Sequence, residues 1–259
     1  NQLNSNFHML VSTKQLLLIL VGVIIGAIIN YLADQLPLKR RLAHPFCRHC
    51  LNPIPPTRWI SLINFIFGHC RCGNKTSWRS IIVELSTAVL LSLVSKLTPT
   101  NTHFIVLSLL LGLFLLIVVI DVEHKLVLNS VLVPTTFIAF YYGMLTNSHD
   151  ITRILATGTA GYTVMILVYF GGKIYHKIMV NNADFSSDIV VFGMGDVRLG
   201  GIVGLSTGWP GLPQALVVSI ISAGIVAIII RTSRSYQPFM ILPYSPFLIA
   251  GTLIALLFR

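Results

Sequence analysis

Long apolar stretches dominate the chain, and polar residues gather in the segments between them. Each stretch approaches the roughly 20 apolar residues that an α-helix needs to cross a bilayer. The pattern predicts about eight transmembrane helices, at residues 14–33, 81–98, 103–120, 127–146, 151–170, 195–210, 212–231 and 238–258. Glycines lower the hydropathy of the sixth stretch, although such small residues suit close helix packing in lipid. We therefore expect an all-α fold, a polytopic integral membrane helical bundle.

The same pattern suggests four parts in the chain. Residues 1–8 are polar and end at a His-Met junction that is typical of a sequence added for expression, so we exclude them from the fold. Residues 9–33 are expected to form the first transmembrane helix, and residues 34–80 a small cysteine-containing cytoplasmic loop domain. Residues 81–259 are expected to form a core of seven membrane helices.

Composition agrees with a membrane protein, because 54% of the residues are hydrophobic, 10% are charged, and the mean hydropathy is +0.82. The net charge of +10 has a simple explanation in the positive-inside rule. If the loop at 34–80 is cytoplasmic, most Lys and Arg residues lie on the same side. We therefore expect the N-terminus outside. No basic segment is interleaved with aromatic residues, which argues against nucleic-acid binding.

Two aspartates lie at the edges of predicted spans. Asp121 ends the third span, and Asp196 begins the sixth within Phe192-Gly193-Met194-Gly195-Asp196-Val197. The predicted topology puts both at the cytoplasmic edge of the membrane, although 75 positions separate them. An ionisable residue at this depth is costly to keep and therefore indicates a functional site. Gly193 and Gly195 have no side chains and would let a substrate backbone approach.

Two close carboxylates can share one proton, so that one removes a proton from water while the other polarises a carbonyl group. This chemistry suits the hydrolysis of a peptide bond. Other interpretations remain open: the first is that the aspartates only cap helices, and the second is that they bind a cation in a transporter. Asp121 with Glu123 and His124 could also form a cation site. A non-catalytic scaffold is a third alternative.

All four cysteines lie in the loop at 34–80, as a C-x-x-C pair and a C-x-C pair: Cys47, Cys50, Cys70 and Cys72. Two thiolate pairs on a cytoplasmic loop predict a structural zinc site that folds a segment too small for its own core. His49 and His69 could replace a ligand, and free reduced thiols are the alternative. After the loop, Ser77 is expected to cap the second span, and Glu84 to pair with Arg79.

Together these features resemble the type IV prepilin peptidases, which are membrane aspartic proteases of the GxGD class. The resemblance covers nearly the whole chain after Met9. It rests on four segments: Gly193–Leu199, Asp121–Lys125, Gly26–Asn30 with Leu36-Pro37, and Arg79 with Val83–Leu85. The chain departs from the family pattern in the C-x-C pair, in Gln35 where arginine is usual, in Ile81 where proline is usual, and in having no proline after Asp121 until Pro134.

The resemblance implies a bacterial cytoplasmic membrane enzyme that acts in type IV pilus assembly and protein secretion. Its substrates would be pilin-like precursors, whose basic leader is cut after a glycine on the cytoplasmic side, with Asp121 and Asp196 as the catalytic pair. It also implies N-methylation of the new N-terminus from S-adenosylmethionine. No glycine-rich strand–turn–helix pattern for this cofactor is visible in the sequence. Arg198 is a candidate to hold a substrate carboxylate.

Overall fold

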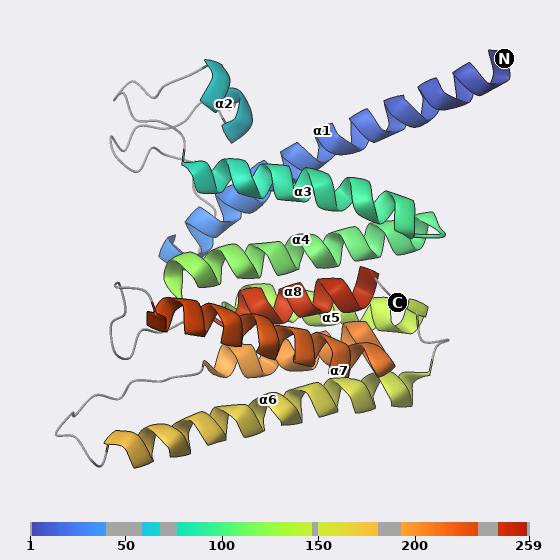
Figure 1. Cartoon of the computed structure of the whole chain (residues 1–259). Helices are drawn as coiled ribbons and strands as arrows, with labels where there is room; N and C mark the ends of the chain where they lie inside the picture. The colour runs from blue at the N-terminus through green and yellow to red at the C-terminus, as the bar shows by residue number, and fades with distance from the viewer. Residues whose placement is uncertain are drawn as a thin grey trace. The chain divides into compact units, whose positions relative to one another are not determined.

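The structure is a computed structural model that describes residues 2–39, 59–67, 77–146, 150–180, 193–232 and 243–257. These residues form α-helices, which confirms the all-α expectation (Figure 1). In chain order the helices are α1 (Gln2–Lys39), α2 (Ser61–Phe67), α3 (Trp78–Leu97), α4 (Asn101–His124), α5 (Asn129–Thr146), α6 (Ile151–Val180), α7 (Met194–Thr232) and α8 (Ser245–Leu257). The short helix α2 was not predicted from the sequence.

Five of the described helices are long and apolar enough to cross a membrane: Thr13–Pro37 of α1, α3, α4, Ile151–Ile174 of α6, and α7. The chain is therefore a multi-pass membrane protein, with fewer candidate spans than the eight expected. The expected spans at 195–210 and 212–231 both lie within α7, which is broken where Gly208 takes φ 61° and ψ −164°. The last expected span, at 238–258, falls on α8, whose 13 residues are fewer than a crossing needs.

The chain forms two compact units, Asn1–Leu116 and Ile117–Arg259. In the N-terminal unit, α1 packs on α3 through glycines one turn apart. A Cβ atom added to Gly22 would lie 2.5 Å from the Cα of Ala88, and one added to Gly26 would lie 2.6 Å from the Cα of Glu84. Glycine is thus required at both positions, because it lets the two backbones approach closely.

The side chain of Glu84 attaches α2 to α3. It is fully buried, and its oxygens accept the backbone N–H groups of Ser61 at 2.6 Å and Leu62 at 2.8 Å. The expected pairing of Glu84 with Arg79 is therefore wrong, since Arg79 instead forms a 2.8 Å ion pair with Asp34 of α1. The N–H groups at the start of a helix lack partners within it, which explains why a buried carboxylate binds there.

Ser77 occupies the position before α3, as expected, but its side chain makes no capping hydrogen bond. Its backbone carbonyl accepts the N–H of Ser80 at 3.1 Å. The carbonyl of Ser80 in turn accepts the side-chain amide of Asn30 from α1 at 2.9 Å. Polar contacts of this kind fix the first turn of α3 against α1 within the N-terminal unit.

In the C-terminal unit α7 packs against α5, α6 and α8. Glycines make the closest approaches on both sides of α7. Gly204 lies against the backbone of Thr157 and Gly158 in α6, and Gly251 of α8 lies against the carbonyl of Ala215. The part of α7 before its break, which begins two residues before Asp196, is therefore held closely on α6, and the part after the break is held on α8.

Candidate functional site

Both aspartates singled out in the sequence lie at helix ends in the C-terminal unit. Asp121 is in the last turn of α4, after a long apolar run, and is 5% exposed. Asp196 is in the first turn of α7 and is 7% exposed. The apolar sequence of each helix accounts for the burial, because each carboxyl group follows or precedes residues that must leave water.

The two carboxyl groups lie close enough for the charge of Asp121 to act on Asp196. The structure thus brings together two residues that the sequence argument placed at one membrane depth. Two buried carboxylates in electrostatic contact cannot both be ionised at low cost, so such a pair holds one proton between them. This arrangement suits general acid and base chemistry.

The two carboxyl groups differ in their hydrogen bonds. Oδ2 of Asp121 accepts the hydroxyl of Ser245 at 2.6 Å and the backbone N–H of the same residue at 3.3 Å. Among the described residues, Oδ1 of Asp196 is buried without a hydrogen-bond partner, while the backbone N–H of Gly193 donates to this carboxyl group. Sequence reasoning missed Ser245. The signal was a serine before Pro246, a pair typical of a helix start.

The two glycines before Asp196 have different surroundings. A Cβ added to Gly195 would lie 2.5 Å from the Cβ of Val127, so packing against Val127 already requires glycine at this position. A Cβ added to Gly193 would meet only Oδ2 of Asp196, at 3.5 Å, and the N of Gly195, at 3.9 Å. Among the described residues, a Cβ at Gly193 would therefore make only ordinary van der Waals contacts, whereas Val127 fills the space beside Gly195.

Tyr244, in the residues just before α8, is a further polar group near the pair. The phenol of Tyr244 lies close enough to Asp196 for the two groups to interact through their charges. The phenol hydroxyl donates to the hydroxyl of Ser219 on α7 at 3.3 Å. The segment that begins α8 therefore provides one residue beside each aspartate, with Ser245 on Asp121 and Tyr244 near Asp196.

The other charged candidates lie around the pair. Arg198 is exposed two residues after Asp196 and donates to the side-chain carbonyl of Asn129 at the start of α5. His124 lies 3.8 Å from Glu123. Within the described ranges, no group of three or more His, Cys, Asp and Glu side chains could hold a metal ion. The structure thus gives no support to a cation site at Asp121, Glu123 and His124.

The expected zinc ligands fall outside the residues that the structure describes. They are Cys47, Cys50, Cys70 and Cys72. The zinc site remains a prediction from their spacing.

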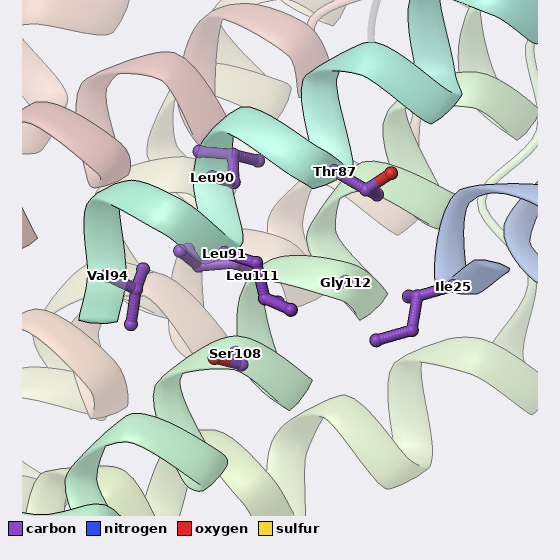
Figure 2. Close-up of a pocket in the computed structure, with 8 residues that line it drawn as sticks. All are labelled: Ile25, Thr87, Leu90, Leu91, Val94, Ser108, Leu111 and Gly112. Carbon is purple, nitrogen blue, oxygen red and sulfur yellow. The ribbon is translucent and has the colours of Figure 1, made fainter. Parts of the chain in front are cut away.

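A small pocket in the N-terminal unit does not have the chemistry of a hydrolase. It is lined by side chains of α1, α3 and α4, as Figure 2 shows: Ile25, Thr87, Leu90, Leu91, Val94, Ser108, Leu111 and Gly112. The hydroxyls of Thr87 and Ser108 are its polar groups, and Thr87 already donates to the carbonyls of Val83 and Glu84, at 2.9 Å each. The lining contains no acid or base, so this pocket is not a candidate active site.

Two family models match separate parts of the chain. The model described as "Type IV leader peptidase family" matches residues 108–228, which include both aspartates. The model described as "Bacterial Peptidase A24 N-terminal domain" matches residues 20–97, which include the cysteine loop. No solved structure matches the chain.

Several curated proteins that are similar to this chain share the name prepilin leader peptidase/N-methyltransferase. The protein from Klebsiella pneumoniae is 26% identical over 78% of this chain and 89% of its own length. The protein from Aeromonas hydrophila is 26% identical over 86% of this chain and 74% of its own. The protein from Pseudomonas aeruginosa is 23% identical over 92% of this chain and 88% of its own. With both family models matched, the chain belongs to the type IV leader peptidase family.

Proposed function

We propose that the protein is an aspartic endopeptidase that removes the leader peptide from type IV prepilin-like precursors at the cytoplasmic face of the membrane. One observation carries the proposal: two buried carboxyl groups, from the end of α4 and the start of α7, lie within range of each other's charge. Family membership supports the reaction class, and the distribution of Lys and Arg supports the cytoplasmic side.

The chemistry of the pair follows from one shared proton. The ionised carboxylate removes a proton from a water molecule, and the water oxygen attacks the scissile carbonyl carbon. The protonated carboxyl group donates a hydrogen bond to the carbonyl oxygen, and a proton then passes to the leaving nitrogen as the C–N bond breaks. Burial excludes bulk water, which strengthens these interactions.

The substrate is expected to enter with its own hydrophobic N-terminal helix between membrane helices. Gly193 is next to Asp196 and, among the described residues, is not crowded by any other side chain, which suits the approach of an extended backbone. Arg198 is exposed close by, where it is available to hold a substrate carboxylate. The alternative role of Arg198 is to anchor the start of α7 at the interface while it donates to Asn129.

Intact-mass spectrometry of a pilin-like precursor, incubated with the protein in lipid vesicles, tests the peptidase proposal. We expect the parent protein to remove the leader and Asp196→Asn to leave the precursor whole. An uncut precursor with folded parent protein would contradict the proposal. Ion-dependent flux into the vesicles would then favour the cation transporter, in which Asp121 and Asp196 serve as ion ligands.

We also propose that the protein methylates the new N-terminus with S-adenosylmethionine, which the names of its relatives support. The methyl group would pass from the sulfonium sulfur to the free amine, which then loses a proton to solvent. Adding S-adenosylmethionine to the same assay should increase the product mass by one methyl group. A cut product whose mass does not change would contradict this second activity alone.

The cysteine loop is proposed to bind one structural zinc ion through Cys47, Cys50, Cys70 and Cys72. Its support is the spacing of the cysteines and the matched N-terminal family domain. We expect metal analysis of the purified protein to find about one zinc per chain and replacement of Cys47 and Cys50 by serine to remove it. Zinc-free protein that is folded and active would contradict this proposal.

A further inference from the structure

We infer that Ser245 is a positioning residue that keeps Asp121 as the ionised member of the pair, so that Asp196 carries the shared proton. The inference rests on the proposed peptidase function and extends it by assigning a role to each carboxyl group. The observations behind it are the hydrogen bonds of Ser245, their absence at one oxygen of Asp196, and the local structure at the start of α8.

Ser245 presents two donors to one oxygen of Asp121. The residue is completely buried, and both its hydroxyl, at 2.6 Å, and its backbone N–H, at 3.3 Å, are directed at Oδ2. A hydroxyl can also accept a hydrogen bond, but a backbone N–H can only donate. Oδ2 therefore faces a fixed donor and acts as an acceptor. Two donors on one oxygen stabilise the ionised carboxylate more than the neutral acid.

The sequence at the start of α8 leaves the N–H of Ser245 free for this contact. Pro246 follows and has no N–H group, while the N–H groups of Phe247 and Leu248 already donate to the carbonyl of Tyr244 at 3.1 and 3.2 Å. The first turn of a helix also carries a partial positive charge, which favours an anion nearby. This effect acts on both carboxyl groups, because Asp121 meets the first turn of α8 and Asp196 lies in the first turn of α7. The donors of Ser245 are therefore what distinguishes Asp121.

Asp196 lacks a comparable set of donors. Among the described residues its Oδ1 has no hydrogen-bond partner, and it is buried to a similar degree as Asp121. The donor described for this carboxyl group is the backbone N–H of Gly193. An ionised carboxylate with one oxygen left without a donor is costly to bury, whereas a protonated one costs less. Among the described residues, the other titratable groups around the pair are Tyr244, which has a charge interaction with Asp196, Arg198 on α7, and Glu123 and His124 on α4.

The difference in hydrogen bonding between the two carboxyl groups assigns each of them a role in the reaction. With Oδ2 of Asp121 held by Ser245, Oδ1 of Asp121 is the oxygen left to take a proton from the attacking water. The proton on Asp196 is then available to the oxygen of the scissile carbonyl. Ser245 would touch neither water nor substrate, and its effect would pass through the position and charge of Asp121.

The test compares Ser245→Ala, Ser245→Thr and the parent protein in lipid vesicles. Ser206→Ala is the matched control, because Ser206 is an equally buried serine on α7 that donates to the carbonyl of Val203. Infrared difference spectra follow the ionisation of carboxyl groups with pH, and Asp121→Asn identifies the band of Asp121. The same proteins are assayed for kcat and KM of precursor cleavage across pH.

In Ser245→Ala the ionised carboxylate loses a charge-assisted hydrogen bond, so a lower proton concentration is needed to ionise it. We expect the Asp121 band and the acid limb of the pH–rate profile to move up by about one pH unit. We expect kcat to fall roughly tenfold with little change in KM. Ser245→Thr restores the hydroxyl and should restore both curves, and Ser206→Ala should match the parent.

An Asp121 band that titrates alike in the parent and in Ser245→Ala, with the parent cutting the precursor, would overturn the role of Ser245 and leave the peptidase proposal intact. If the Asp121 band shifts in Ser245→Ala but the parent protein cuts no precursor, the peptidase proposal is overturned. The proposed role of Ser245 in catalysis is then overturned with it. A loss of kcat in Ser245→Ala without any change in the pH profile would indicate a structural role alone and would also overturn the inference.

Discussion

Cleavage of a pilin-like precursor is expected to fall by the same factor, roughly 10³- to 10⁴-fold, in Asp121→Asn, in Asp196→Asn and in the double variant. Asparagine keeps the size of the side chain but can neither remove a proton from water nor hold the shared proton. Because the two carboxyl groups interact in the C-terminal unit, the loss of one removes the function of the other. The second substitution should therefore add nothing.

The measurement is the rate of leader removal by mass spectrometry, under single-turnover conditions in lipid. Asp150→Asn is the matched control, since Asp150 is a carboxylate outside the pair that bonds Thr152 and Arg153 at the start of α6. This variant should cleave at the parent rate. Losses in the single variants that multiply in the double variant would show that the two aspartates act independently, contrary to the shared-proton mechanism.

Hydropathy and topology were sufficient to predict the main helices and the approach of the two aspartates. The apolar run before Asp121 had to form a buried helix, and the run after Asp196 had to form another. The positive-inside rule then placed both residues at one depth. The catalytic role of the pair is a prediction from chemistry that the cleavage assay tests.

Contacts between residues far apart in the sequence were not predictable in the same way. Ser245 meets Asp121 across 124 positions, and no periodic pattern specifies that approach. Gly195 was interpreted as room for substrate, whereas the neighbour that explains it is Val127, in the segment after α4. Glu84 was paired with Arg79 because the two lie close in sequence, but the partner of Glu84 is the backbone of the short helix α2.

The boundary between the sixth and seventh expected spans agrees with the structure to within a few residues. Hydropathy counts apolar residues and contains no information on backbone angles. The backbone of α7 turns at Gly208 and Trp209. The two expected spans are therefore the two helical parts of α7 on either side of this break. Pro210 after the break cannot donate a helical hydrogen bond, which is consistent with an interruption at this point.

The largest effect on stability is expected from a single methyl group at Gly204. A Cβ at this position would lie well inside van der Waals contact with the carbonyl oxygen of Thr157 and 3.0 Å from the Cα of Gly158. Both neighbours are backbone atoms of α6, which cannot move aside as a flexible side chain would. Gly204→Ala should therefore force α6 and α7 apart and lower the free energy of unfolding by about 3 kcal/mol.

Gly224→Ala on the same helix is the matched control, because a Cβ at Gly224 would meet no atom of the described residues within 4 Å. Alanine favours the helical backbone over glycine, so this variant should be as stable as the parent or more stable by up to about 1 kcal/mol. Unfolding in mixed micelles by a titration with denaturing detergent, followed by circular dichroism, measures both. The free energy of unfolding should fall in Gly204→Ala and stay equal or rise in Gly224→Ala, and this difference separates the effect of helix packing from that of helix propensity. Equal stability of the two variants would show that α6 and α7 do not approach as closely as the backbone contacts at Gly204 require. Because α7 carries Asp196 two residues from its start, Gly204→Ala should also reduce leader cleavage, to the extent that the folded fraction falls.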